Sequence, residues 1–358
     1  ALGPRPHALT AEAEPVRRAD RLDAETRSSA TRALGLLALL AALAVATIAS
    51  LAIGARSIPP LEVLQILLGN DTGQNAVVVT QLRVPRTLIA IVAGAALGVA
   101  GALIQAVTRN PLADPGILGV NAGAAFALAM GTGLLGVSGA LGTLTLAYVG
   151  AFAASLLVYA IGSLGRGGAS PVRLILAGVA LGAVLAGITR AIVLTDREKF
   201  AGMTAWESGS LLDRDAGLLW LAAPFVLLGL GIALAIGSSL NAIALGDDLA
   251  SALGANVLRT RVFAVAAVML LAGTATALAG PISFVGLMVP HAVRWIVGPD
   301  QRWIIAYSVV AAPTLLLLAD VLGRVVIAPG ELPAGIVTAL VGAPVLIFLV
   351  RQRKASEL

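Results

Sequence analysis

The sequence lacks cysteine altogether, and it holds only two histidines, His7 and His291, and two lysines, Lys199 and Lys354. The lack of cysteine excludes disulfides, thiolate metal sites and cysteine-ligated iron–sulfur clusters, and two histidines exclude a metal site built from several of them. No G-x-x-x-x-G-K-[ST] phosphate loop occurs, so the chain cannot bind and hydrolyse ATP in that way. We therefore predict no catalytic residue and no metal site in this chain.

Charge is also scarce. Only 12% of the 358 residues are charged, whereas 58% are hydrophobic. A soluble domain carries about 25% charged residues, so this composition excludes a cytosolic enzyme, a disordered chain and a nucleic-acid binder. The net charge of +5 comes from basic residues that are scattered without forming a basic face. Such an excess is typical of a membrane protein with positively charged inside loops.

Ten apolar segments are candidate membrane spans, although several are short or broken by glycine and proline. The first, residues 33–53, has 21 residues without a charge, enough to cross about 30 Å of hydrocarbon. It is longer than the apolar region of a secretory signal peptide, which favours a retained anchor. The ten segments are apolar on all sides, which predicts helices rather than the alternating strands of a membrane barrel. The other nine cover residues 86–107, 116–135, 141–163, 173–194, 218–239, 262–280, 283–297, 303–323 and 334–350.

Residues 1–32 form a polar segment with six arginines and five acidic residues, which predicts a flexible or loosely helical tail. If this tail lies inside and the chain crosses ten times, 16 basic residues fall inside and eight outside. The positive-inside rule then places both termini in the cytoplasm.

Two stretches resemble each other, residues 93–101 and 272–280, with five of nine positions identical and Pro111 opposite Pro290. In the ten-span topology they run in opposite directions, which is the pattern of an inverted repeat in a transporter. The alternative is two helices that independently carry small packing faces.

Two irregular segments flank the second span. Arg83 and Arg86, three residues apart around Pro85, place two positive charges on an expected exposed outer collar. They would either snorkel to the interface or dock an acidic partner surface. At the inner end, residues 110–121 contain two prolines, an aspartate and two asparagines. Such backbone is either a plain turn or a segment that lines a wet cavity.

Two more irregular segments follow. In residues 245–257, Asp247 and Asp248 suit a helix start, and Leu249 and Leu253 share an apolar stripe that Gly254 ends. This short inside helix would lie in the lipid interface or enter a groove on a partner. Residues 280–291 bring proline and glycine to a short span that contains His291, a residue more typical of packing than of ligation.

Asp320 lies in an otherwise apolar span with Arg324 four residues later. An intramembrane acid is a functional candidate, and a local ion pair at the outer end is an equally good explanation.

At these segments the sequence resembles the FecCD-like permease family of type II ABC importers, over about residues 33–354. The motifs that carry the resemblance are RVPRTL at 83–88, GALIQAVTRNPLADPGILGVNAGA at 101–124, LILAGVALGA at 174–183, LGDDLASALG at 245–254, GPISFVGLMVPHAVR at 280–294, and LADVLGR with GELPAGIVTALVGAPVLI within 318–347. The resemblance implies an all-α polytopic fold of about ten helices with an inverted repeat. It also implies import of a ferric siderophore, or of haem or cobalamin, across the bacterial inner membrane.

The resemblance further implies partners. A second permease subunit, identical or homologous, completes the pathway, two ATPase subunits bind ATP and Mg²⁺, and an extracytoplasmic binding protein delivers the substrate. Membrane lipid surrounds the chain, which itself holds no cofactor and binds no nucleic acid.

Site residues follow from the matching motifs. Arg83 and Arg86, joined by Arg324, would meet acidic residues of the binding protein. Asn110 and Leu112 would belong to the inner gate, and Ser170 and Pro171 to a second gate element. The ATPase-coupling segment, at about residues 241–258, would use Gly246, Asp247, Asp248, Leu249, Leu253, Gly254 and Asn256.

A secondary transporter driven by an ion gradient is the alternative from another class. It would need intramembrane carboxylates, for which only Asp320 and the inner-mouth Asp114 are available. A purely structural membrane protein would leave the irregular segments unexplained.

Overall fold

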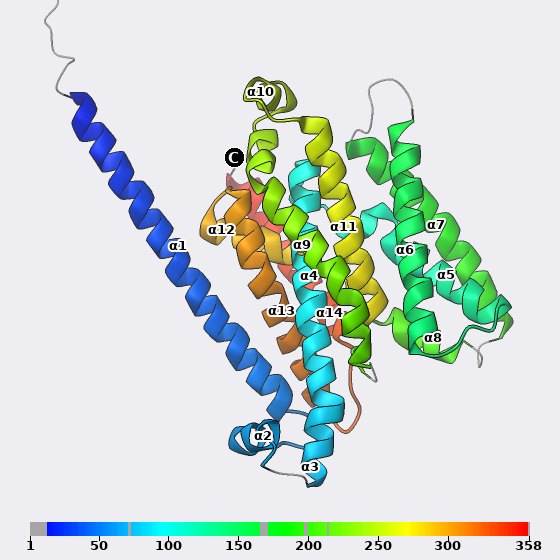
Figure 1. Ribbon diagram of the computed structural model, residues 1–358. Coiled ribbons are helices and arrows are strands. Elements are labelled where there is room, and N and C mark those ends of the chain that lie inside the picture. Colours follow the sequence, from blue (N-terminus) through cyan, green and yellow to red (C-terminus); the bar gives the residue numbers. More distant parts are fainter. Residues whose placement is uncertain (1–12, 71–72, 165–170, 197–199, 213–214, 357–358) are drawn as a thin grey trace, which may run out of the picture.

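The computed structural model describes residues 13–70, 73–164, 171–196, 200–212 and 215–356, and these residues form a helical bundle (Figure 1). Every predicted span has a helix. In the described part, seven helices are long and apolar enough to cross a membrane, and three apolar helices are shorter. The ten are α1 (Ala13–Ala52), α4 (Val84–Thr108), α5 (Val120–Leu134), α6 (Ala140–Ser163), α7 (Pro171–Thr195), α9 (Gly217–Ala244), α11 (Val257–Ala279), α12 (Val285–Val297), α13 (Gln301–Val326) and α14 (Ala334–Ser356). The protein is an all-α polytopic bundle.

Short elements connect these helices at the two ends of the bundle. They are α2 (Pro60–Leu67), α3 (Gln74–Val77), the π-helical turn η1 (Val78–Arg83), the 3-10 turn η2 (Pro115–Leu118), α8 (Ala201–Glu207) and α10 (Asp247–Ala252). Figure 1 shows α2 and α3 at one end and α10 at the other, which we call the α2 end and the α10 end. Helix α1 starts toward the α10 end, and the last residues of α14 also lie there.

The predicted polar tail is helical where the structure describes it, because α1 begins at Ala13 and runs without a break into the first span. Helix α1 lies on the outside of the bundle, where it contacts α13, and its upper part stands away from the other helices in Figure 1; its segment Ser29–Ala52 is largely exposed. The Tyr307 hydroxyl of α13 donates to the Arg32 carbonyl oxygen, which holds the two helices together at this level.

The core of the bundle is built around α4, α11 and α13, most of whose residues are buried, whereas α7 and α9 are mostly exposed. Helices α4 and α11 carry the two similar stretches of sequence. They lie side by side at the centre of Figure 1 and run in opposite directions. This is the arrangement that an inverted repeat would give, although close packing of small residues alone would also place them here.

Glycines let α4 approach its neighbours closely. A Cβ atom at Gly94 would lie 2.6 Å from the Pro313 Cα, and one at Gly101 would lie 1.7 Å from the Gly286 carbonyl oxygen. A side chain at either position cannot be accommodated without moving backbone. The small residues of α4 therefore fix the distances to α13 and α12, as expected for helices that pack in lipid.

A π-helical turn precedes α4, which the sequence analysis did not anticipate. The Val84 N–H donates to the Val79 carbonyl oxygen, five residues back. Pro85 follows and has no N–H, so a regular α-helix would leave the carbonyl of residue 81 without its hydrogen bond here. The wider π-helical turn accommodates this missing donor. This turn orients Arg83 and the start of α4.

Candidate functional site

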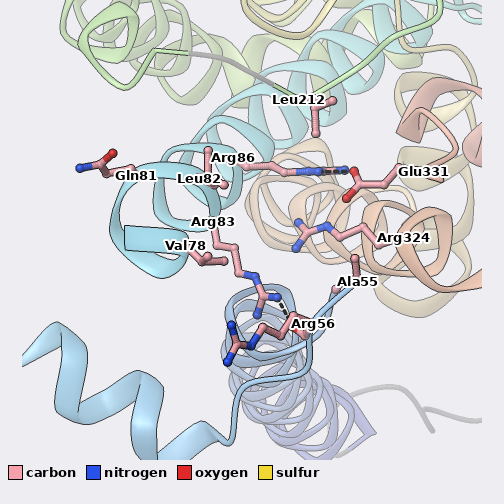
Figure 2. Close-up of a pocket in the computed structure, with 11 residues that line it drawn as sticks. Ala55, Arg56, Val78, Gln81, Leu82, Arg83, Arg86, Leu212, Arg324 and Glu331 are labelled. Carbon is pink, nitrogen blue, oxygen red and sulfur yellow. Dashed lines mark hydrogen bonds and ion pairs between the residues drawn. The ribbon is translucent and has the colours of Figure 1, made fainter. Parts of the chain in front are cut away.

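A cleft of about 290 Å³ opens at the α2 end. Figure 2 shows that four arginines and one glutamate reach it from η1, from α4, from α13 and from the loops after α1 and α13. These charged residues are Arg56, Arg83, Arg86, Arg324 and Glu331.

Asp320 lies directly behind the cleft and holds two of its arginines. The Asp320 carboxylate is fully buried, and its Oδ1 accepts from the Arg86 Nη2 at 2.7 Å and Nε at 3.0 Å. Its Oδ2 accepts from the Arg324 guanidinium. Both oxygens of the acid are thus bonded to arginines from two different helices, which satisfies a charge that burial would otherwise penalise heavily.

Two guanidinium groups also cap the end of α1. The Arg83 Nη1 donates to the carbonyl oxygens of Leu51 at 2.7 Å and Ala52 at 2.9 Å. The Arg324 Nη1 donates to the Ser50 carbonyl oxygen at 2.8 Å. The last carbonyls of a helix lack partners within the helix and carry its partial negative charge, so a cation is favourable here.

The expected exposed collar of arginines is therefore not what the structure contains. Arg83, Arg86 and Arg324 are only 6%, 8% and 2% exposed, because the end of α1 and the loop after α13 cover them. Only the edges of their guanidinium groups line the cleft. Together with the exposed Arg56, and against Asp320 and Glu331, they leave the cluster with a net charge of +2.

Asp320 and three of the arginines were predicted from the sequence to be functional candidates, whereas Arg56 and Glu331 were not. Arg56 follows the first span and counted only as an outside charge, and Glu331 lies in a connecting loop, within a family motif that assigned it no role. The local Asp320–Arg324 ion pair, one of the two interpretations of this acid, is present. His291 is buried, and its ring stacks edge-on against Trp295 at 5.3 Å, as expected for a packed histidine.

The segment at the α10 end has the local structure that the sequence predicts. Helix α10 begins at Asp247, after Gly246 with a φ of 115°, and ends before Gly254, whose φ is 82°. Leu249 and Leu253 are 49% and 63% exposed, while Ala250 is buried against the bundle. The apolar stripe therefore points away from the chain.

Ion pairs fix α10 to the core. The Asp247 carboxylate bonds the Arg109 guanidinium at the end of α4, and it accepts from the Arg261 Nη2 of α11 at 3.0 Å. Asp248 is exposed, and the Asn256 side chain caps α11 by accepting from the Arg259 N–H at 2.9 Å. A displacement of α10 would thus act directly on the two central helices.

The irregular segment after α4 is held by its own polar side chains. The Asn110 Oδ1 accepts from the Leu112 N–H at 3.0 Å, and the Leu112 side chain is 42% exposed. The Asp114 Oδ1 accepts from the Gly116 N–H at 2.8 Å and starts η2. Burial raises the pKa of Asp114, and the hydrogen bond from Gly116 partly opposes that rise.

The remaining gate candidates are described only in part. Ser170 lies outside the described residues, and Pro171 is the first residue of α7.

The structure also contains two hydrogen bonds between elements that were not predicted from the sequence. The Thr276 hydroxyl donates to the Asn121 Oδ1 at 2.9 Å, and the Gln105 Nε2 donates to the Leu287 carbonyl oxygen at 2.9 Å. They tie α5 to α11 and α4 to α12.

Known proteins resemble this chain over most of its length. Residues 42–352 match the model of the FecCD transport family. The ferric enterobactin transport system permease protein FepD of Escherichia coli (strain K12) is 48% identical over 325 residues, which cover 91% of this chain and 97% of that protein. The Fe(3+)-citrate import system permease protein YfmD of Bacillus subtilis (strain 168) is 38% identical over 84% of this chain and 89% of that protein.

A solved structure has the same fold. It is described as an inward-facing conformation of a metal-chelate type ABC transporter, and it superposes with a TM-score of 0.77 at 29% identity, covering 88% of this chain and 98% of the other. The family model, the relatives and this superposition agree over nearly the whole described bundle. The chain is therefore a multi-pass inner-membrane protein that belongs to the FecCD transport family of ABC importer permeases.

Proposed function

We propose that this chain forms the membrane pathway of an ATP-driven importer that carries a ferric siderophore into the cell. The observation that carries the proposal is the 48% identity to a ferric enterobactin permease over nearly the full length of both chains. Haem and cobalamin remain the alternative cargoes. In this function the chain is a transport subunit rather than an enzyme, and separate ATPase subunits bind ATP and Mg²⁺.

The distribution of basic residues supports one orientation of the chain in the membrane. We place the α10 end in the cytoplasm and the α2 end outside, so that both termini are cytoplasmic. The excess of basic residues in the segments assigned to the inside supports this orientation.

Helix α10 would seat in a groove of an ATPase subunit. Leu249 and Leu253 offer exposed apolar side chains on a short rigid helix, which suits insertion into a partner groove. The Asp247 ion pairs to Arg109 and Arg261 would pass its displacement to α4 and α11. ATP binding by the partners would thereby tilt the core helices and move the gate at Asn110, Leu112, Ser170 and Pro171.

The cleft at the α2 end would receive an acidic side chain of the extracytoplasmic binding protein. Its net positive charge supports this role, with Arg56 at the surface and the buried Arg83, Arg86 and Arg324 adding to the local potential. A second permease subunit would complete the pathway between the two copies.

An ion-driven secondary transporter is less compatible with this geometry. Asp320, the acid within a span, has both oxygens bonded to arginines, and the Asp114 Oδ1 already caps η2. Neither arrangement resembles an open site for a coupling ion.

Uptake measurements test the proposal. Labelled ferric catecholate and hydroxamate siderophores, ferric citrate, haem and cobalamin are offered to a strain that lacks the gene and to the complemented strain. We expect loss of one ferric siderophore class, restored on complementation and sensitive to ATP depletion but not to an uncoupler. Normal uptake of every ferric siderophore by the deletion strain would contradict the assigned cargo.

A further inference from the structure

Glu331 occupies the cleft in a way that differs from Asp320. The Glu331 Oε2 accepts from the Arg86 Nη1 at 2.6 Å, and 27% of the Glu331 side chain is exposed (Figure 2). The Asp320 side chain, on the opposite edge of the same guanidinium, has no exposed surface. Arg86 therefore has one permanent carboxylate partner inside the protein and one at the surface of the cleft.

Asp320 alone is sufficient to orient Arg86. It receives the Nε and Nη2 of the guanidinium, a two-point contact that fixes the plane of the group. The Nη1 is left pointing toward the cleft, where it meets Glu331. A carboxylate that enters from outside would find this donor already aimed, with a competing acid in the same place.

The backbone around Glu331 is anchored while its side chain is not enclosed. The Leu332 N–H donates to the Gly323 carbonyl oxygen at 2.9 Å, and the Gly335 N–H donates to the Gly209 carbonyl oxygen at 3.1 Å. Residues 325–330 on the other side are exposed. The carboxylate can thus leave Arg86 by rotation of the side chain, without movement of the loop.

We propose that Glu331 is an internal substitute for the partner's acid: it occupies Arg86 in the undocked transporter, and an acidic side chain of the binding protein displaces it on docking. This inference rests on the proposed docking of that protein at the cleft. The exchange keeps the cluster hydrogen-bonded in both states. It also weakens docking, because each docking event must break the resident ion pair, and so it favours release of the empty binding protein.

The test is the affinity of the assembled transporter, in lipid nanodiscs, for the purified binding protein of the same transport system. Glu331→Gln removes the competing charge, and we expect a Kd about two- to fivefold lower, the range set by partly exposed ion pairs. The gain should shrink as salt is raised. Glu331→Ala should give the same gain, which excludes a new hydrogen bond from the glutamine amide.

Glu62→Gln is the matched control. Glu62, on α2 at the same end, accepts from Asn75 at 2.5 Å and does not line the cleft, yet its replacement makes the same change in net charge. We expect an unchanged Kd for this control.

Equal gains in affinity from Glu331→Gln and Glu62→Gln would reveal a general effect of net charge and overturn the exchange. An unchanged Kd for Glu331→Gln, with weaker binding for Arg56→Glu, would overturn the exchange and leave docking intact. An unchanged Kd for Arg56→Glu would refute docking itself.

Discussion

The buried carboxylate of Asp320 bonds both Arg86 and Arg324, and Arg324 also donates to a carbonyl oxygen at the end of α1. Replacing it with alanine would leave the buried Arg324 guanidinium without a counter-ion and Arg86 with Glu331 alone. We expect Asp320→Ala to lower the free energy of unfolding by about 3–5 kcal/mol, whereas Glu331→Gln, at a partly exposed pair, should cost at most about 1 kcal/mol. Thermal unfolding in detergent measures both, and similar shifts for the two variants would contradict this distinction.

Asp114 makes stability depend on pH. Because burial raises its folded-state pKa above the ordinary value of about 3.9, ionisation is easier in the unfolded chain. The stability that this residue contributes is present at pH values below its unfolded-state pKa. It is lost as pH rises from the unfolded-state pKa to the higher folded-state pKa.

Asp114→Asn keeps the acceptor for the Gly116 N–H but does not ionise. We expect the variant to melt at a higher temperature than the wild type at pH 7, with the difference vanishing toward pH 4. Melting curves across this range check the sign, and a variant that is less stable at pH 7 would show it to be wrong.

Single residues also show how far the sequence could be interpreted. Arg83, Arg86, Arg324 and Asp320 are recognisable because a charge in an apolar segment needs a reason. Their partners are not, because Arg83 bonds carbonyls 31 and 32 residues away and Arg86 bonds an acid 234 residues away. Glu331 lies in a family motif that starts at Gly330, yet no role was predicted for it, since an acid in a polar loop is ordinary.

At the scale of elements, close approach of helices is the property most open to test. Gly101→Ala would place a methyl group 1.7 Å from the Gly286 carbonyl oxygen, so we expect a loss of at least about 2–3 kcal/mol of stability. Gly187→Ala is the control, because a Cβ there meets nothing within 4 Å and the exposed helix gains up to about 1 kcal/mol. Thermal midpoints that fall equally would contradict the close-packing argument.

Helix α10 is the element to which coupling is assigned. We expect Leu253→Asp to abolish transport and ATPase binding while membrane insertion is kept, because it puts a charge on the exposed apolar stripe. Gly254→Pro should act similarly, since proline cannot adopt a φ of 82°. Leu61→Asp, at an equally exposed leucine on α2, should leave ATPase binding intact. Normal uptake by the α10 variants would refute the assignment.

Hydropathy predicts the helices well because a span must be apolar over a fixed length. It left the polar tail, which is helical from Ala13 to residue 32, as either flexible or loosely helical, and it could not predict the π-helical turn before α4. The first follows from continuity with a stable span, and the second from the missing N–H of Pro85.

For the whole molecule, docking should depend on the field of the cleft rather than on one contact. The burial of Arg83 and Arg86 means that a glutamate at either position would disturb the fold, so Arg56 is the cleaner probe. We expect Arg56→Glu to weaken binding of the extracytoplasmic protein severalfold at low salt and less at high salt. A Kd that is independent of both charge and salt would contradict the proposed electrostatics.

Helix α4 connects the cleft at the α2 end to α10 at the opposite end of the bundle. It begins beside Arg83 and Arg86 in the cleft, and Arg109, directly after its last residue, bonds α10. Its 25 residues span about 37 Å, so a tilt of about 5° around its midpoint would move each end by about 1.6 Å in opposite directions. A binding protein docked outside and an ATPase docked inside would then act on opposite ends of one rigid helix. The helix would pivot near Gly94, Gly98 and Gly101, where it packs closely against α13 and α12.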